Sequence, residues 1–506
     1  MVDITSQTSE ISQSQEDIQE ELSEILQIRR EKLKKLQNEG RDPFEVTKFE
    51  RTAFASEISE NFDSMENTEV SMAGRVMAKR EMGKAIFVDI VDDKGRIQLY
   101  MKQSEIGEQS FADINKGDIG DIIGISGTVF KTRMGEISIR CKSVVLLSKS
   151  LRPLPEKFHG LTNQELKYRQ RYVDLIMNPQ TRRTFELRSA FIRHIREFLD
   201  ARGYMEVETP ILNTLSGGAA ARPFITHHNT LGIDMYLRIA TELHLKRLTV
   251  GGIERVYEIG RIFRNEGMST KHNPEFTSVE LYEAYTDYHG MMELFEELLS
   301  SAAMKLLGTY KLTWQNMEID LTPGWPRVTM ADAVKEHTGV DFMSFSSVED
   351  AVAAADSIGV KMPDGKEPSW GDLLFECFDR RVESKLVQPI FIIDHPVEVS
   401  PFAKRKPSDP RLTERYEVFI GKSEMGNAFS ELNDPIDQKE RFIRQAQLRN
   451  QGDEAANMMD EDYINALEYG LPPTGGLGIG VDRCVMLLTG QSSIRDVLFF
   501  PTMKPE

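Results

Sequence analysis

A polar stretch between two apolar runs contains the residue types that can bind a nucleotide. Arg264 and Glu266 follow an apolar run that begins near Val256, and His272 and Phe276 lie where the apolar pattern resumes. An arginine fork suits a phosphate or a carboxylate, and a phenylalanine ring offers an apolar face to a purine. The pattern predicts a strand, a polar loop and a returning strand. For a single hairpin of this kind, the alternative is a solvated loop with its charges in water.

A second arginine motif lies far downstream. Gly476, Gly478 and Gly480 alternate with apolar residues, so a strand there allows a ligand to approach the backbone closely. A helix is expected to begin near Asp482, with Arg483 in its first turn, and the amino end of a helix favours anions. The spacing does not match the GxGxxG dinucleotide fingerprint. Two such motifs in one chain favour a phosphate-binding site over a solvated hairpin.

Together these stretches resemble motifs 2 and 3 of the class II aminoacyl-tRNA synthetases, and in detail they are similar to the lysyl-tRNA synthetases of bacterial type. The motifs that carry the resemblance are Arg264-Asn265-Glu266 with His272-Asn273-Pro274-Glu275-Phe276, the run from Gly217 to Phe224, and the run from Gly426 to Asp434. The resemblance implies ATP-dependent activation of L-lysine to lysyl-adenylate with release of pyrophosphate. Transfer of lysine to the 3′ end of tRNA(Lys) would follow.

The resemblance also implies which residues act on the nucleotide. Arg264 and Arg483 would be catalytic, with Arg264 between the substrate carboxylate and the α-phosphate. Since an amino-acid carboxylate is already ionised at neutral pH, activation needs positioning and neutralisation of phosphate charge rather than a general base. The ATP-binding residues implied are Arg264, Glu266, His272, Asn273, Phe276, Gly480 and Arg483.

A lysine side chain needs anionic partners in a pocket that excludes water. Glu280 and Glu431 are carboxylates on strands otherwise rich in apolar residues, and Tyr282 lies on the same strand face as Glu280. The alternative for the two glutamates is a salt bridge to a nearby lysine or arginine. The lysine-binding residues that the resemblance implies are Gly217, Glu242, Arg264, Glu280, Tyr282, Asn427, Phe429 and Glu431.

The resemblance further implies Mg²⁺ as a cofactor, bound by Glu417 and Glu424. Magnesium prefers carboxylates together with phosphate oxygens, which ATP supplies. The separation of the two glutamates does not by itself define a metal site, and two strand carboxylates are usually surface residues.

The region before residue 150 has a strand pattern. Ile86, Val88 and Ile90 alternate with other residues before a turn at residues 92–95, which predicts a hairpin. Five strands and a helix near residues 104–114 fit an OB-fold barrel, a fold that binds single-stranded nucleic acid. The resemblance implies that the residues that read the anticodon are Phe87, Gln98 and Glu136. A single aromatic residue on a strand is, however, usually part of the core.

The fold class predicted for the whole chain is α+β. An OB-fold β-barrel precedes a class II catalytic domain with a mixed, mainly antiparallel sheet flanked by helices. A helix from Thr184 to Ala201, followed by the run from Tyr204 to Pro210, resembles motif 1 and implies a homodimer. The boundaries expected are a disordered tail over 1–14, a helix and connection over 15–65, the barrel over 66–148, a linker over 149–180, and the catalytic domain over 181–506 with an insertion over 330–400.

Length and charge limit the possible classes of protein. The chain has 506 residues, too many for one core, and a formal net charge of −18, so any RNA partner must be held by local basic patches. The basic second half of the helix expected to end near residue 38 is interpreted as part of a docked surface helix, with contact to RNA backbone as the alternative. Three cysteines without metal-site spacing predict a reduced, cytoplasmic protein. No apolar run reaches membrane-spanning length, so no membrane partner is expected.

Three alternatives stay open. An aspartyl or asparaginyl enzyme shares the barrel and the catalytic domain, but its pocket should carry a cationic group, whereas the predicted pocket is rich in glutamate. A lysine ligase acting on a protein would use the same activation chemistry but would lack the barrel. A non-catalytic nucleic-acid binder would have a degenerate synthetase domain, which the intact Arg264, Phe276 and Arg483 oppose.

Overall fold

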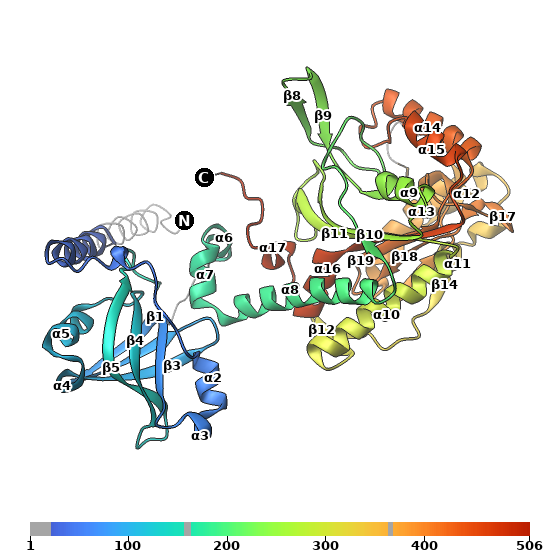
Figure 1. The fold of residues 1–506 in the computed structure, drawn as a ribbon. Helices are drawn as coiled ribbons and strands as arrows, with labels where there is room; N and C mark the ends of the chain where they lie inside the picture. The colour runs from blue at the N-terminus through green and yellow to red at the C-terminus, as the bar shows by residue number, and fades with distance from the viewer. Residues whose placement is uncertain (1–21, 156–162, 363–367, 506) are drawn as a thin grey trace, which may run out of the picture. The chain divides into compact units, whose positions relative to one another are not determined.

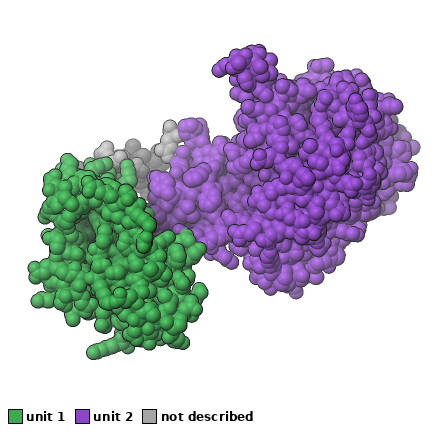
Figure 2. Space-filling view, viewed as in Figure 1, with its two compact units in different colours: residues 1–160 green, residues 161–506 purple. Residues whose placement is uncertain are grey.

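The computed structural model describes residues 22–155, 163–362 and 368–505. The chain separates into two compact units, residues 1–160 and residues 161–506, which Figure 2 shows in different colours. The tail expected over residues 1–14 lies outside the described residues, and residues 22–38 are helical. Within the described ranges, the structure contains no helix with the length and apolar character needed to cross a membrane.

The first unit is built around a closed five-stranded barrel, with strand order β1-β2-β3-β5-β4 (Figure 1). The helix expected near residues 104–114 is instead two short helices, because Gly107 lies between them with a φ of 84°. The strands are β1 (Glu69–Met82), β2 (Ala85–Val91), β3 (Arg96–Lys102), β4 (Ile122–Lys131) and β5 (Ile137–Ser148). The short helices are η1 (Pro43–Glu45), α2 (Ala55–Glu60), α3 (Phe62–Met65), α4 (Gln103–Ile106) and α5 (Glu108–Lys116).

The predicted hairpin of the barrel is confirmed. Ile86, Val88 and Ile90 on β2 are fully buried in the barrel core and pair with residues of β3 across the ladder. Phe87 lies between two of these inward-facing residues, so strand alternation places it on the opposite face, where it is half-buried. Phe87 therefore belongs to the outer surface of the barrel rather than to its core.

The second unit contains an eight-stranded sheet with strand order β14-β15-β18-β19-β20-β11-β10-β6. Two neighbouring pairs, β14 with β15 and β10 with β6, are parallel, and the other pairs are antiparallel, as expected for a mixed, mainly antiparallel sheet. The strands of this sheet are β6 (Met205–Glu206), β10 (Arg255–Phe263), β11 (Glu275–Ala284), β14 (Arg327–Thr329), β15 (Ile390–Ile393), β18 (Arg415–Phe419), β19 (Glu424–Ser430) and β20 (Thr474–Gly480).

Smaller sheets and helices surround this sheet (Figure 1). The smaller sheets contain β7 (Leu212–Asn213), β8 (Ile225–His228) and β9 (Ile233–Leu237), β12 (Lys311–Trp314) and β13 (Met317–Asp320), and β16 (Arg405–Lys406) and β17 (Asp409–Thr413). The α-helices are α6 (Gln164–Arg169), α7 (Arg171–Met177), α8 (Pro179–Asp200), α9 (Glu242–Val250), α10 (Tyr288–Leu307), α11 (Met330–Thr338), α12 (Val348–Ser357), α13 (Trp370–Arg381), α14 (Pro435–Asn450), α15 (Glu461–Glu468), α16 (Val481–Thr489) and α17 (Ile494–Val497). Short 3₁₀ turns are η2 (Phe342–Ser344), η3 (Glu383–Lys385) and η4 (Val397–Val399).

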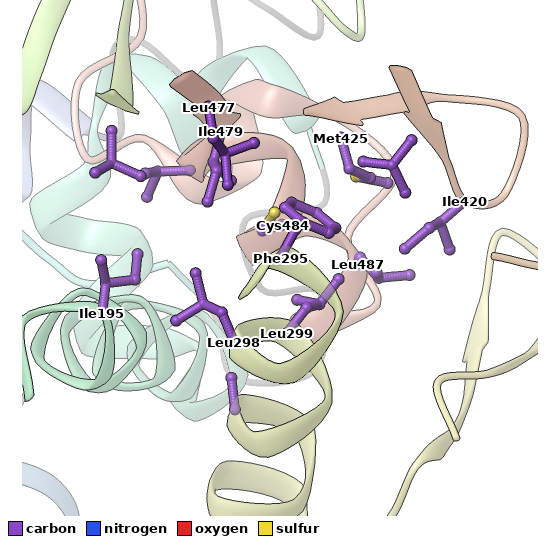
Figure 3. Close-up of a cluster of buried hydrophobic side chains, with 14 of the residues drawn as sticks. Ile195, Phe295, Leu298, Leu299, Ile420, Met425, Leu477, Ile479, Cys484 and Leu487 are labelled. Atoms are coloured by element: carbon purple, nitrogen blue, oxygen red, sulfur yellow. The ribbon is translucent and has the colours of Figure 1, made fainter. Parts of the chain in front are cut away.

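Helices α8, α10 and α16 pack against one face of the large sheet. Figure 3 shows part of the resulting core, where Ile195 of α8, Phe295 of α10 and Cys484 of α16 lie near Leu477 and Ile479 of β20. Because side chains alternate along a strand, the residues between these core positions face the other side of the sheet. That other face is left free to form a cavity.

The segments expected to be a linker and an insertion contain helices and a strand that pack into the second unit. The second half of the expected linker, residues 149–180, forms α6 and α7. Arg171 is buried there against Asp174 and donates to the main-chain oxygens of Arg495 and Leu498, near the end of the chain. The segment 330–400 contains α11, α12 and α13, which share a hydrophobic cluster of their own, and it supplies the strand β15 near one edge of the sheet.

Candidate active site

A cavity of about 480 Å³ opens in the second unit, over the middle strands of the large sheet. Its walls come from β11, β18, β19 and β20, from the loop between β10 and β11, and from the beginnings of α9 and α16. The residues expected at the site that line this cavity are Glu242, Arg264, Glu266, His272, Asn273, Phe276, Glu280, Tyr282, Glu417, Glu424, Asn427, Phe429, Gly480 and Arg483.

Strand alternation explains why these side chains meet. On β11, Val279 and Leu281 are buried in the core, so Glu280 and Tyr282 face the cavity. On β20 the corresponding positions are glycines, which leave the space free. A Cβ atom at Gly476 would overlap with the carboxylate of Glu431 and with the ring of Tyr282, so glycine is required there for steric reasons.

Arg264 lies directly after β10, which ends at Phe263. Its guanidinium carbon is 5.3 Å from the centre of the Phe276 ring. The only side-chain hydrogen bond that Arg264 makes to the described residues is a long one, from Nε to the carbonyl oxygen of Ile239 at 3.4 Å. Burial lowers the pKa of this arginine from its usual range. The terminal nitrogens are therefore available to an anionic ligand.

Arg483 lies in the first turn of α16, as expected. Its Nη1 donates to the main-chain oxygen of Glu424 at 2.7 Å and lies 3.2 Å from that residue's Oε2. Its Nη2 is 3.4 Å from Nε2 of His272. Asp482 fixes the beginning of the helix by pairing with Arg188 and accepting from the main-chain nitrogen of Thr277. The two arginine motifs therefore converge on one cavity.

The loop between β10 and β11 is held by its own polar side chains. His272 Nδ1 lies 2.9 Å from the hydroxyl of Ser269, and partial burial together with the charge of Arg483 lowers the pKa of His272. The amide of Asn273 donates to the main-chain oxygen of Glu275 at 2.6 Å and accepts from the main-chain nitrogen of Thr502 at 3.2 Å. Asn273 thus shapes the cavity through the backbone that it holds.

Glu417 and Glu424 lie on the neighbouring strands β18 and β19. Burial raises the pKa of Glu417 to about 7, and the negative charge of Glu424 adds to this effect against the opposing charge of Arg415. Within the described residues, no group of three or more metal-ligating side chains is found. The carboxylate oxygens of Glu417 and Glu424 are of the type that Mg²⁺ binds together with oxygens of phosphates and water.

Arg415 was not among the residues predicted from the sequence. This arginine donates from Nη2 to Glu417 at 2.6 Å and from Nε to the side-chain oxygen of Asn427 at 2.9 Å. It therefore connects the carboxylate expected to bind metal with the amide expected to contact lysine. Two positions before Glu417 on the same strand, it shares that residue's face, which is the signal that could have revealed it.

Glu280 and Tyr282 form the anionic end of the cavity. Glu280 accepts a hydrogen bond from the main-chain nitrogen of Thr241 at 3.1 Å, and the hydroxyl of Tyr282 is 3.5 Å from its other oxygen. Burial and the charge of Glu242 raise the pKa of Glu280 to about 7. This carboxyl group has no cationic partner among the hydrogen bonds and ion pairs of the described residues, so an ammonium ligand would complete it.

Glu431 does not line the cavity but lies fully buried behind its wall. Its carboxylate forms an ion pair with Lys246, which also donates to Glu242 at 2.6 Å. The salt-bridge alternative is therefore realised for Glu431. Lys246 was missed by sequence analysis, because a lysine four residues after a glutamate on a helix is typical of a surface pair.

Gly217 also lies outside the cavity wall, which its neighbour Gly218 lines. The main-chain nitrogen of Gly218 donates to the side-chain oxygen of Asn457 at 3.0 Å, and Gly218 has a φ of 88°. Asn457 is buried and holds this loop from a segment with no local sequence signal, so it too was missed.

The outer face of the barrel carries a row of aromatic side chains. Phe87 and Tyr100 are directly paired across β2 and β3, with ring centres 5.1 Å apart, and Phe130 lies 6.1 Å from Tyr100. Arg140 lies over the ring of Phe130 at 5.1 Å. Only Phe87 of this row was identified from the sequence.

The two polar residues expected beside Phe87 differ in exposure. Gln98 is buried and accepts a hydrogen bond from the hydroxyl of Ser138 at 3.1 Å. Glu136 is exposed in the turn between β4 and β5, and its main-chain oxygen lies 3.4 Å from the same hydroxyl. Ser138 therefore connects these two positions.

Comparison with known proteins places both units in described families. The family model of class II tRNA synthetases for D, K and N matches residues 163–504, and the model of the OB-fold nucleic acid binding domain matches residues 70–147. Curated relatives named lysine–tRNA ligase include one from Pelotomaculum thermopropionicum, 57% identical over 96% of this chain and 96% of its own. Another, from Thermoanaerobacter pseudethanolicus, is 58% identical over 96% of this chain and 97% of its own.

A third relative of the same name, from Carboxydothermus hydrogenoformans, is 57% identical over 96% of this chain and 99% of its own. The matches therefore extend through both the barrel and the catalytic unit and cover nearly the full length of each relative. The chain belongs to the class II aminoacyl-tRNA synthetases, within their lysine–tRNA ligase family.

Proposed function

We propose that this protein activates L-lysine with ATP and transfers it to tRNA(Lys). The observation that carries the proposal is the presence of both kinds of charge in one cavity. Its wall includes Arg264 and Arg483 together with Glu242, Glu280 and the hydroxyl of Tyr282. Lysine presents one carboxylate and two ammonium groups, and ATP presents phosphates. A cavity with guanidinium groups beside carboxylates can bind both ligands in one orientation.

In the first step, an oxygen of the lysine carboxylate attacks the α-phosphorus of ATP, and the bond to pyrophosphate breaks. Arg264 holds the carboxylate against the α-phosphate and offsets the negative charge that both bring, while the Phe276 ring beside it supports the purine. Arg483 and the neutral His272 face the outer phosphates. Mg²⁺ bound at Glu417 and Glu424 would offset further phosphate charge.

In the second step, the terminal ribose hydroxyl of tRNA attacks the carbonyl carbon of the lysyl adenylate, and AMP leaves. The barrel contributes by binding the anticodon. Phe87, Tyr100 and Phe130 offer rings on which bases stack, and Arg140 supplies a positive charge beside them. Glu136 and Gln98 supply polar groups next to this row.

The composition of the pocket favours lysine over the acidic and amide amino acids of related enzymes. An aspartate side chain would need a cation where Glu242 and Glu280 lie, and Lys246 is itself neutralised behind them. A ligase that attaches lysine to a protein would not need the aromatic row of the barrel. The glutamate-rich pocket therefore supports lysine as the amino acid, and the aromatic row supports tRNA as the acceptor.

We further propose that the protein acts as a homodimer in the cytoplasm. The three cysteines are buried free thiols, which suits a reducing compartment. Several large apolar side chains are exposed in the segment that follows α8, which includes the β8–β9 hairpin that projects from the rest of the second unit (Figure 1). Apolar side chains of this kind favour burial against a second copy. The residues are Met205, Ile211, Leu212, Leu215, Ile225, Leu231 and Ile233.

The test is ATP–pyrophosphate exchange with each amino acid in turn, with Mg²⁺ and without tRNA. Exchange restricted to lysine is expected, followed by charging of tRNA(Lys) when the tRNA is added. Exchange with aspartate or asparagine would overturn the assignment of the pocket, and a folded protein that exchanges with no amino acid, with or without tRNA, would overturn the enzymatic function.

A further inference from the structure

A lysine is already buried behind the wall of the proposed lysine pocket. The side chain of Lys246 is wholly inaccessible to solvent, as is that of Glu431, and the side chain of Glu242 is 9% exposed. Lys246 lies one turn after Glu242 on α9 and reaches behind the cavity wall to Glu431 at the end of β19. An ammonium group without water around it is costly to bury unless carboxylates surround it, so its presence here requires an explanation.

Three aromatic rings enclose the same ammonium group. Nζ of Lys246 lies 5.1 Å from the centre of the Phe402 ring, 5.3 Å from that of Phe429 and 5.8 Å from that of Tyr282. Burial opposes the charge of this lysine, but Glu242 and Glu431 outweigh burial and raise its pKa above the usual range. Lys246 is therefore a fixed positive charge at neutral pH.

The carboxylates of the pocket outnumber its buried ammonium group. Glu242, Glu280 and Glu431 bring three carboxylates to adjoining positions, and Lys246 brings one ammonium group. When all four of these groups are ionised, the negative charges exceed the positive charge by two. Lysine as a ligand has two ammonium groups, one at each end, and its own carboxylate is matched by Arg264. A pocket of low dielectric favours the ligand that brings this sum to zero.

We propose that Lys246 is a positioning and specificity-determining residue of the amino-acid pocket. Its ammonium group holds Glu242 and Glu431 in place and cancels one of the three negative charges. The pocket therefore matches a ligand with two ammonium groups. The inference rests on the proposed function and deepens it. Lys246 acts through the two glutamates, because the cavity wall includes Glu242 but not Lys246 itself among the described residues.

The geometry of Glu431 supports this role. Apart from the ion pair with Lys246, neither of its carboxylate oxygens has a hydrogen bond to the described residues. One of these oxygens occupies the space that a Cβ atom of Gly476 would take, and Gly476 lines the cavity. Lys246 therefore holds the carboxylate at a point of the wall where residue 476 contributes no side chain.

The test is a cycle of three variants, Lys246→Met, Glu431→Gln and the two together, followed by ATP–pyrophosphate exchange. Lys246→Met leaves three negative charges opposite a ligand with two positive ones, and Glu431→Gln leaves one. Each single variant is expected to raise the KM for lysine about 10- to 100-fold, the range for a lost charged hydrogen bond. The double variant restores the balance of two charges, so its KM for lysine is expected to fall below that of Glu431→Gln alone.

The KM for ATP separates this role from a structural one, since Lys246 pairs with Glu242 and Glu431, which are not among the residues proposed to bind ATP. It is expected to stay within about threefold of the unmodified protein's value in all variants, well under the tenfold change that 1.4 kcal/mol represents. Lys305→Met serves as the matched control, because Lys305 also pairs with a glutamate, Glu197, but both side chains are about half exposed. This control is expected to leave both KM values unchanged.

Each result decides one question. If the double variant has a KM for lysine equal to or higher than that of Glu431→Gln, Lys246 has only a structural role and the inference is overturned. This comparison stands even if Lys246→Met alone does not fold, because the double variant leaves no unpaired charge at the fully buried position 431. Glu242 also loses its partner, but it lines the cavity, where an ammonium group of the ligand can pair with it. Failure of the unmodified protein to exchange with lysine would overturn the proposed function instead.

Discussion

Nη2 of Arg483 lies 3.4 Å from Nε2 of His272, although 211 residues separate them in the chain. The contact joins the first turn of α16 to the loop between β10 and β11, and it brings together the two arginine motifs that the sequence presents separately. It exists because β11 and β20 are neighbours in the sheet, with Ser278 paired with Gly480. The following predictions concern the cavity that this pairing creates and the surface of the barrel.

Replacing Arg264 by alanine should reduce kcat for ATP–pyrophosphate exchange about 100- to 1,000-fold, the effect of removing one positioned donor to a developing charge. The terminal nitrogens of Arg264 are not used by the described residues, so the loss falls on the ligand. Arg261→Ala is the control, since Arg261 pairs with Glu275 and both side chains are partly exposed. Equal losses in the two variants would contradict the assignment of Arg264.

Replacing Gly476 by alanine should destabilise the protein by about 1–3 kcal/mol and raise the KM for lysine, because the new methyl group displaces Glu431 and Tyr282. Gly478→Ala is the matched control on the same strand, where the nearest atoms to a Cβ are at an ordinary 3.8 Å. Thermal unfolding of both variants checks the prediction. A lower Tm for Gly478→Ala than for Gly476→Ala would be inconsistent with the packing described.

Lysine affinity should increase as pH rises toward 7 and then level off. Burial and the charge of Glu242 raise the pKa of Glu280 to about 7 in the empty pocket. A bound ammonium group favours the ionised carboxylate and lowers that pKa, so binding releases a proton and is favoured at higher pH. If binding releases one proton, the affinity for lysine rises by at most about tenfold per pH unit while the pH is below the pKa of Glu280 in the free protein.

Calorimetry in two buffers of different ionisation enthalpy measures this proton release directly. The unmodified protein should release protons near pH 6.5 when lysine binds. Glu280→Gln should bind lysine more weakly and release fewer protons at the same pH. A proton count that is the same in both proteins would show that Glu280 does not titrate on binding.

Replacing Tyr100 on the barrel by alanine should weaken tRNA charging without affecting ATP–pyrophosphate exchange. Stacking of a base on an aromatic ring contributes about 1–3 kcal/mol, so the KM for tRNA is expected to rise while the KM for lysine stays constant. Phe44→Ala, which removes an exposed ring elsewhere in the first unit, is the control. An unchanged KM for tRNA would exclude the aromatic row from RNA binding.

Sequence patterns predicted the elements of the fold well where a periodic pattern was strong. The β2–β3 hairpin and the start of α16 near Asp482 follow from local alternation and glycine placement, and the structure confirms them. The helix near residues 104–114 was predicted as continuous, because the pattern does not show that Gly107 adopts a positive φ. Local sequence therefore determines the type of these elements better than it determines their continuity.

The candidate site was predictable for residues in local motifs and not for those that act across the fold. Lys246 looks like an ordinary surface partner of Glu242, and only the folded chain brings Glu431, which directly follows β19, to its ammonium group. Asn457 reaches Gly218 from a distant segment, so no spacing rule marks it. The direction of Phe87 was undecided until the barrel core showed which neighbours point inward.

The position of β20 has a consequence for how the chain acquires its structure during synthesis. β20 is the last strand in the sequence, yet it lies between β19 and β11 near the middle of the sheet. While residues 474–480 are still inside the ribosome, β19 and β11 each have an unpaired edge, and the strand that lines the cavity between them is missing. Pairing over such long sequence separations is slow and exposes edges to aggregation. A strand that emerges after its two neighbours therefore closes the sheet and completes the site.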